Sequence, residues 1–255
     1  MQETEQLEQA LQLIAEVSKP FQLVVVVGSE DSGKSSLIQY CCGRRYQKEN
    51  GKLTATGKGT PDRKREADAT LEIAVLEDTV FFQWRQFQEL PELNHSVEQF
   101  LLLRLLQSAA TVYWVGVVEW HSVEAQKGKL FREFYTAFRQ TFPEEIQHYM
   151  TWVAAKIPEN NDLQGLLERL ILYVPNFAST VSNTSLLECS LTDQGESAAK
   201  LMATLRGLPS VGMEIDPISI VEVFKANPET ALCEALEHQY SRVSQLFLEV
   251  YGPNG

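Results

Sequence analysis

Short apolar runs alternate along this chain with stretches in which apolar residues recur at helical spacing. The apolar runs predict strands over 23–27, 70–76, 110–118, 149–155 and 185–189. Helical spacing predicts one helix that begins at 36, and further helices over 97–108, 122–142, 161–174 and 194–205. The run at 110–118 is apolar throughout, which is typical of a central strand buried on both faces. This alternation favours an α/β fold, with a mostly parallel, doubly wound sheet flanked by helices.

The same pattern divides the chain into three parts. Spacing predicts an N-terminal helix over 4–18, and Pro20 precedes the first strand. We therefore expect a helix in 1–19, an α/β domain in 20–206 and a helical extension in 207–255. The last helix, over about 228–250, is expected to pack on the domain; a coiled coil with a partner is the alternative. Residues 44–68 are polar and rich in glycine, and their composition predicts a flexible loop.

A glycine-rich motif follows the first strand. Residues 28–35 read G-S-E-D-S-G-K-S, a complete G-x-x-x-x-G-K-S pattern between a strand and a helix. Backbone N–H groups of such a loop converge on phosphates, its lysine reaches the β and γ oxygens, and its serine hydroxyl ligates Mg²⁺. The motif thus predicts a nucleotide site made by Gly28, Glu30, Asp31, Ser32, Gly33, Lys34, Ser35 and Ser36, with Ser35 also a magnesium ligand.

Composition narrows the other functional classes. The 255 residues hold 22 Lys+Arg and 34 Asp+Glu, a net charge of −12 that argues against nonspecific binding of nucleic acid or anionic membranes. Apolar runs fall short of the roughly 20 residues of a membrane span, and the acidic start is unlike a signal peptide. Neither end carries a lipidation signal, so we expect a cytoplasmic protein without a membrane anchor. The four cysteines and four histidines show no metal-ligand spacing, which favours free thiols.

A phosphate loop followed by four more strand–helix units resembles the small GTPase family, of the Ras and Rab type, over about residues 22–206. The resemblance implies GTP or GDP and Mg²⁺ as cofactors. It also implies a switch threonine that reaches the metal. Thr54, Thr56 and Thr60 lie in the corresponding loop, and Thr56 is the working candidate among the three.

The family's next motif is Asp-x-x-Gly. Its counterpart here is Asp78-Thr79-Val80-Phe81, so the resemblance makes Asp78 the magnesium-side aspartate. Phe81 stands where the family has a glycine that contacts the γ-phosphate, and Gln83 is offset from the place of a water-positioning glutamine. These departures predict little or no hydrolysis. The apolar run 81–84 is expected in the core, with a partner-docking surface as the alternative.

The base-reading motifs are also altered. The family's Asn-Lys-x-Asp position reads Ala155-Lys156-Ile157-Pro158, so the carboxylate that selects guanine is missing and only Lys156 remains. Base selection should therefore be weak. The last motif, Ser-Ala-Lys in the family, corresponds to Ser190-Leu191-Thr192, which implies that Ser190 and Leu191 contact the base.

An intact phosphate loop with altered switch and base motifs resembles atypical small GTPases, or pseudo-GTPases. Within that group the chain is similar to the Rab-like subunits of the intraflagellar transport complex, and secondly to dynein light intermediate chains. The resemblance implies a regulatory or scaffolding subunit of an intracellular transport complex, in the cytoplasm or at a cilium or flagellum, with other protein subunits as partners. Two alternatives stay open. One is an active P-loop enzyme, either a slow GTPase or a small kinase, and the other is an interaction module with an empty loop.

Overall fold

The computed structural model describes residues 8, 12, 15, 20–29, 31–49, 52–56, 73–84, 102, 105–158, 162–180 and 186–212. Its strands are β1 (Phe21–Gly28), β2 (Arg45–Glu49), β3 (Lys52–Thr56), β4 (Ile73–Leu76), β5 (Thr79–Gln83), β6 (Ala109–Glu119), β7 (Thr151–Ala155) and β8 (Leu186–Glu188). Its helices are α2 (Lys34–Cys41), α4 (Trp120–Glu124), the 3₁₀ turn η1 (Ala125–Lys127), α5 (Lys129–Thr141), α6 (Glu144–Tyr149), α7 (Leu163–Tyr173), α8 (Pro175–Thr180) and α9 (Glu196–Arg206).

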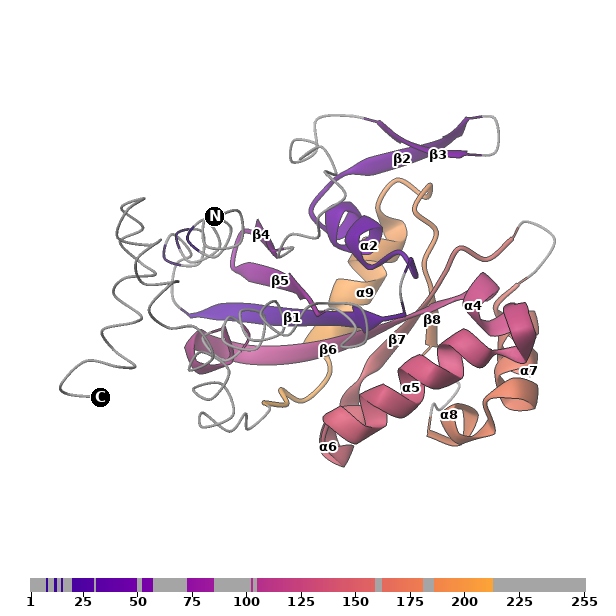
Figure 1. The fold of residues 1–255 in the computed structure, drawn as a ribbon. Coiled ribbons are helices and arrows are strands. Elements are labelled where there is room, and N and C mark those ends of the chain that lie inside the picture. Colours follow the sequence, from indigo (N-terminus) through magenta and orange to yellow (C-terminus); the bar gives the residue numbers. More distant parts are fainter. Residues whose placement is uncertain are drawn as a thin grey trace, which may run out of the picture.

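Six strands form one sheet in the order β4-β5-β1-β6-β7-β8 (Figure 1). The pairs from β5 through β8 are parallel, whereas β4 runs antiparallel to β5 at one edge. Strands β2 and β3 form a separate antiparallel hairpin next to α2. The predicted α/β fold, with a mostly parallel sheet flanked by helices, is therefore confirmed.

Both faces of the sheet are covered, which explains the uninterrupted apolar runs in its central strands. Successive side chains of a strand point to opposite faces, so Leu23 and Val25 of β1 enter one hydrophobic cluster while Val24 and Val26 enter the other. Helices α2 and α9 cover the second face, and α4 to α8 cover the first (Figure 1). The predicted two-sided burial of the 110–118 strand is confirmed from Val112 onward.

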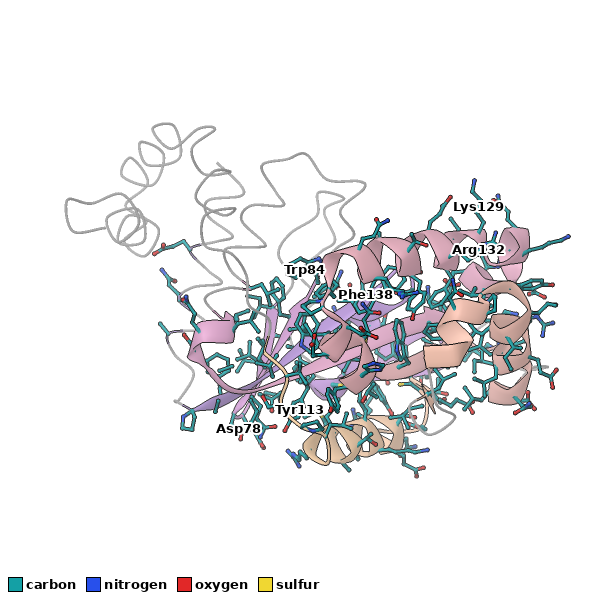
Figure 2. All side chains as sticks on the ribbon, turned by 90° about the horizontal axis from the view of Figure 1, so that it is seen from below. Asp78, Trp84, Tyr113, Lys129, Arg132 and Phe138 are labelled. Atoms are coloured by element: carbon teal, nitrogen blue, oxygen red, sulfur yellow. The ribbon has the colours of Figure 1, made fainter. Side chains whose placement is uncertain are left out.

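The larger cluster is aromatic. Trp152 of β7 meets Phe177 edge to face, with ring centroids 4.7 Å apart, and Phe138 of α5 contacts Trp152 as well. Space for Trp152 comes from Gly116 of β6, where an added Cβ would lie 2.4 Å from the indole ring. On α5, Phe138 points towards the sheet while Lys129 points outward (Figure 2). Helix α5 is therefore amphipathic and packs its aromatic face over β7.

Two predicted elements have different boundaries in the structure. The helix expected over 122–142 is interrupted, because Gln126, Lys127 and Gly128 all have positive φ. Helix α6 occupies the start of the strand expected at 149–155, so β7 begins at Thr151. By contrast, Asp162 caps α7, where its carboxylate accepts a hydrogen bond of 2.7 Å from the backbone N–H of Gly165.

The prediction of a flexible loop over 44–68 is wrong for the two strands of the β2–β3 hairpin, 45–49 and 52–56. Tyr46 attaches this hairpin to α2, because its hydroxyl donates to Gln39 Oε1 at 2.9 Å. The Arg44 guanidinium also donates to Gln39 Oε1 and lies 5.7 Å from the centroid of the Tyr46 ring. Polar contacts to a neighbouring helix thus stabilise strands that the composition did not predict.

The ends of the chain are described only in part. Glu8, Gln12 and Ala15 are helical, in agreement with the helix expected over 4–18, whose other residues lie outside the described ranges. The helix expected over 228–250 also lies outside them. After α9 the chain returns to β6, where the backbone N–H of Val211 donates to the Val112 carbonyl at 3.1 Å. Within the described ranges, no helix has the length and apolar character that crossing a membrane requires.

Candidate phosphate-binding site

The glycine-rich loop connects the carboxyl end of β1 to the first turn of α2. Gly33 has φ +101° and ψ +18°, a left-handed conformation that glycine adopts without steric cost. Its carbonyl already accepts the first helical hydrogen bond, from the N–H of Leu37 at 2.9 Å. The other N–H groups of the first turn of α2 therefore point out of the helix start, into the loop.

Gly28 is required where the loop leaves the sheet. A Cβ at this position would lie 2.7 Å from Ser32 Oγ and 2.9 Å from the Val117 carbonyl of β6. The backbone contact cannot be relieved without moving the loop or the neighbouring strand. The first glycine of the motif thus lets the loop fold tightly against β6.

Lys34 lies inside the loop with only 7% of its surface exposed. Its ammonium donates hydrogen bonds to the carbonyl oxygens of Gly28, at 3.0 Å, and Ser29, at 2.6 Å. These bonds hold the positive charge across the mouth of the loop. An ammonium held at the start of a helix adds its charge to the partial positive charge of the helix dipole, and both favour an anion at this position.

Two hydroxyl groups of the loop support the same interpretation. Ser29 Oγ and Ser32 Oγ are buried and have no hydrogen-bond partner within the described part of the chain. A buried hydroxyl without a partner costs free energy, and a bound group with acceptor oxygens removes that cost. The loop therefore combines a held cation with unpaired donors, the chemistry that phosphate oxygens need.

The side chain after the lysine contacts the neighbouring strand. Ser35 Oγ donates to Gln83 Oε1 at 2.9 Å, and Gln83 is the last residue of β5. Its backbone lies opposite Val26 in the parallel β1–β5 pair, close to the loop. The side chain next to Ser35, the serine predicted to ligate a metal, therefore ends in a neutral amide.

The assignment of Asp78 to the magnesium site is wrong. Asp78 lies in the turn between β4 and β5, and its carbonyl accepts a 2.7 Å hydrogen bond from the N–H of Gln22 at the start of β1. Figure 2 shows Asp78 at the end of the sheet where β1 begins. Because β1 and β5 are parallel, Asp78 lies at the end of the sheet where both strands begin, whereas Ser35 lies near the end where they finish. The error arose because the sequence pattern did not reveal β5.

Phe81 is likewise not a switch residue. It lies in the middle of β5 opposite Val24, and it is 1% exposed. Together with Phe82 and Trp84 it belongs to the buried core, which confirms the core interpretation of the run 81–84. Phe81 therefore says nothing about contact with a γ-phosphate.

Lys156 connects the expected base-reading loop to the phosphate loop. It follows β7 with φ +53°, and its ammonium donates a hydrogen bond to the backbone carbonyl of Asp31. Asp31 also has a positive φ, of +53°. The Lys156 stem passes close to Gly33, where an added Cβ would lie 3.5 Å from Lys156 Cε. The lysine thus supports the loop from the side on which a base is expected.

A buried carboxyl group lies at the same edge. Glu119 ends β6, and burial raises its pKa above the usual range. The positive charges of Lys156 and His121 oppose that rise, whereas Asp31 adds to it. Glu119 is therefore electrostatically coupled to the residues that join the two loops.

The third loop of the site follows β8. Ser190 and Leu191 lie there, and the backbone N–H of Ser190 donates to Ser197 Oγ at 3.1 Å. The loop is fixed by Asp193, whose carboxylate accepts from the Ser197 backbone N–H at 2.9 Å and from the Tyr40 hydroxyl of α2. The phosphate-loop helix and the β8–α9 loop thus share one polar network.

The remaining predicted residues fall into three groups. Ser36 lies in the first turn of α2 with the rest of the motif, while Glu30 and Thr60 lie outside the described residues. Thr54 and Thr56 belong to β3, where Thr56 is paired with Arg45 in the hairpin. Whether any threonine ligates a metal stays a prediction.

Sequence reasoning did not place Gln83, Glu119 or Asp193 at the site. Gln83 has no recognisable signal, because a glutamine at the end of a strand is not a usual metal-side residue. Asp193 carries a partial signal, since an acidic residue shortly before a helix is typical of an N-terminal cap. Nothing in the sequence connects Asp193 to Tyr40, which lies far away along the chain.

The chain is similar to a solved structure described as the crystal structure of a probable GTP-binding protein, engB. The two share 13% sequence identity with a TM-score of 0.43, over 73% of this chain and 97% of that one. A scan against protein-family models gives no match, and neither does a search of curated proteins.

Proposed function

We propose that this chain binds the phosphates of GTP or GDP through residues 28–35, with weak selection of the base and little or no hydrolysis. The observation that supports the proposal is the Lys34 ammonium, buried in the loop and held there by the carbonyls of Gly28 and Ser29. It lies at the start of α2, where the helix dipole also favours an anion.

Weak base selection is supported by the loop after β7. Ala155 ends the strand and Pro158 stands where a guanine-selecting carboxylate is expected. Proline has no carboxylate, so it cannot accept the two hydrogen bonds that a guanine edge donates. Lys156 already donates to Asp31, and this contact supports the loop whichever base is bound.

We further propose that the bound nucleotide stabilises a regulatory or scaffolding subunit of an intracellular transport complex, in the cytoplasm or at a cilium. The neutral Gln83 beside Ser35 supports slow or absent hydrolysis, because it supplies no charge to hold a catalytic metal. A ligand that binds only the folded state adds about 4 kcal/mol of stability at a thousandfold excess over its dissociation constant. Such a role requires binding and no turnover.

The direct test is to denature the purified protein and identify the released nucleotide by ion-exchange chromatography, before any nucleotide is added. We expect guanine nucleotide, alone or mixed with adenine nucleotide. If no nucleotide is released and GTP with Mg²⁺ gives no thermal shift, the proposal is contradicted and the chain is an interaction module with an empty loop. Rapid turnover of GTP by the pure protein would instead show an active P-loop enzyme.

The transport role needs a separate measurement. The tagged full-length chain is recovered from its own cells and the associated proteins are identified by mass spectrometry. Stoichiometric recovery of the subunits of a ciliary or motor complex is expected. Recovery of the chain alone would contradict a role as a subunit.

A further inference from the structure

We propose that nucleotide binding by this chain depends little on Mg²⁺, because Gln83 places a neutral amide where a magnesium site needs a carboxylate. The inference rests on the proposed function, since it concerns how the phosphates are held. It identifies Gln83 as the residue that sets the metal dependence.

The backbone of Gln83 is held in place by its strand. The backbone of β5 is in parallel register with β1, where Gln83 lies opposite Val26. The next residue, Trp84, donates its backbone N–H to the Val26 carbonyl at 2.9 Å, and its indole ring is buried. Gln83 therefore occupies a fixed position at the carboxyl edge of the sheet, next to the start of α2.

Ser35 and Gln83 form a pair. Ser35 Oγ donates to Gln83 Oε1 at 2.9 Å, so the hydroxyl proton is directed at the amide. For Ser35 to ligate a cation, a lone pair of its hydroxyl oxygen must face the metal. The amide oxygen of Gln83 then accepts a hydrogen bond either from that hydroxyl or from a metal-bound water. In either arrangement the pair of Ser35 and Gln83 adds no negative charge.

Magnesium is a hard cation that proteins hold mainly through carboxylates together with substrate phosphates. Within the described residues, no three side chains of His, Cys, Asp or Glu are gathered in a way that could hold a metal ion. Asp78, the carboxylate expected there, lies at the end of the sheet where β1 begins, away from Ser35. Among the residues that the structure describes, the donor set around Ser35 therefore fits Mg²⁺ poorly.

The phosphates have another source of positive charge. The Lys34 ammonium is buried in the loop, and the start of α2 adds the partial charge of the helix dipole. These charges belong to the fold and do not depend on dissolved metal. The structure thus separates two functions that a P-loop often combines, holding the phosphates and holding the metal.

The test measures the dissociation constant of a fluorescent guanosine diphosphate, N-methylanthraniloyl-GDP, in magnesium chloride and in EDTA. For the full chain we expect the two values to agree within about threefold, since Gln83, the described residue beside Ser35, brings no carboxylate to a metal. In Gln83→Glu, which has the same size and adds a carboxylate, removing the metal should weaken binding by about 10–100-fold. Gln83→Met, which is neutral and close in size, is the matched control: whatever its affinity, its dissociation constants in magnesium chloride and in EDTA should also agree within about threefold.

The outcomes separate the two proposals. Tight binding by the natural chain that falls tenfold or more in EDTA would overturn this inference and leave the proposed function standing. A Gln83→Glu variant that folds, as judged by circular dichroism, and gains no metal dependence would also overturn it. If that variant does not fold, the natural chain alone decides the matter. Absence of binding in both solutions would contradict the proposed function, and this inference with it.

Discussion

The phosphate end and the base end of the candidate site differ in how completely they are built. At the phosphate end, Lys34 is buried and bonded, Gly33 is left-handed and Gly28 fits against β6. At the base end, Ala155 and Pro158 supply no side chain that accepts a hydrogen bond, and Lys156 extends back to the phosphate loop. The phosphate end therefore has the features of a ligand site, while Lys156 at the base end supports the phosphate loop.

This difference teaches which part of a nucleotide should determine affinity. Phosphate contacts are charged and come from backbone and lysine, so they are similar for every nucleoside diphosphate. Base selection requires buried polar groups that a wrong base leaves unpaired. A site with the first and without the second should respond to the number of phosphates and be nearly indifferent to the base.

The largest expected effect follows from removing the charge at the phosphate end. Lys34→Ala should weaken nucleotide binding by at least about 30-fold, because hydrogen bonds to charged groups contribute about 1.5–3 kcal/mol each. Titration with a fluorescent nucleotide measures the loss. Lys129→Ala is the control, since Lys129 is exposed on α5 and pairs only loosely with Glu133 at 3.8 Å. Equal affinities for the two variants would show that the loop does not hold the phosphates.

Next is the backbone of the loop. Gly33→Ala should destabilise the protein by about 1–2 kcal/mol, because an alanine strains a left-handed backbone. Its Cβ would meet only Lys156 Cε, at an ordinary 3.5 Å, so crowding adds little. Urea unfolding measures the change. Gly43→Ala, also left-handed but with nothing within 4 Å of its Cβ, should cost similar stability and leave nucleotide binding unchanged.

A smaller effect is expected from changing the base. The dissociation constants of GDP and ADP should differ by less than about tenfold, far below the roughly 10⁴–10⁵ that a hydrogen-bonding site achieves. Competition against the fluorescent nucleotide gives both constants. Pro158→Asp, which restores a carboxylate, should increase the preference for guanine. A strong guanine preference in the natural chain would contradict weak base selection and mean that other residues, such as those of the β8–α9 loop, read the base.

The smallest effect concerns two cysteines, one that caps the C-terminus of α2 and one that follows β8. Burial raises the pKa of Cys42, on the α2 side, and of Cys189, at the end of β8, from about 9.0 to about 11. The folded state therefore keeps protons that the unfolded state loses above pH 9.0, and the stabilisation disappears as the pH rises towards 11.

Urea midpoints measured across that range should decline less steeply in Cys42→Ala and Cys189→Ala than in the natural chain. All other residues are common to the three proteins, so the difference in slope reports on the thiol alone. Parallel declines would show that these thiols do not contribute to the alkaline loss of stability.

Much of the phosphate end could be predicted from sequence, because its signals are local. The apolar run of β1, the glycine spacing and the start of α2 are adjacent in the chain, and each reports a backbone requirement of the loop. The two-sided burial of β6 was also predictable, since a central parallel strand is apolar throughout. These features depend on a few residues each, so periodicity was sufficient.

The metal side could not be predicted, because it depends on one turn. Only Glu77 and Asp78 separate β4 from β5, and Glu77 has φ +52°. If the turn is overlooked, Asp78 is expected to follow a strand that runs towards the phosphate loop. With it, Asp78 lies at the amino end of the next strand. Because of this two-residue turn, Asp78 lies at the end of the sheet opposite to the phosphate loop. Gln83 lies where the metal ligand was expected.

The position of β1 has a consequence for how the protein is made. The whole motif is synthesised once Ser35 is added, yet Gly28 fits against Val117 and β1 pairs with β6 from Phe21–Ala109 to Gly28–Val117. Parallel neighbours need a long crossover, so this pairing waits until the ribosome has released the chain beyond Glu119. A nascent chain stalled before β6 would carry the complete motif and bind no phosphate.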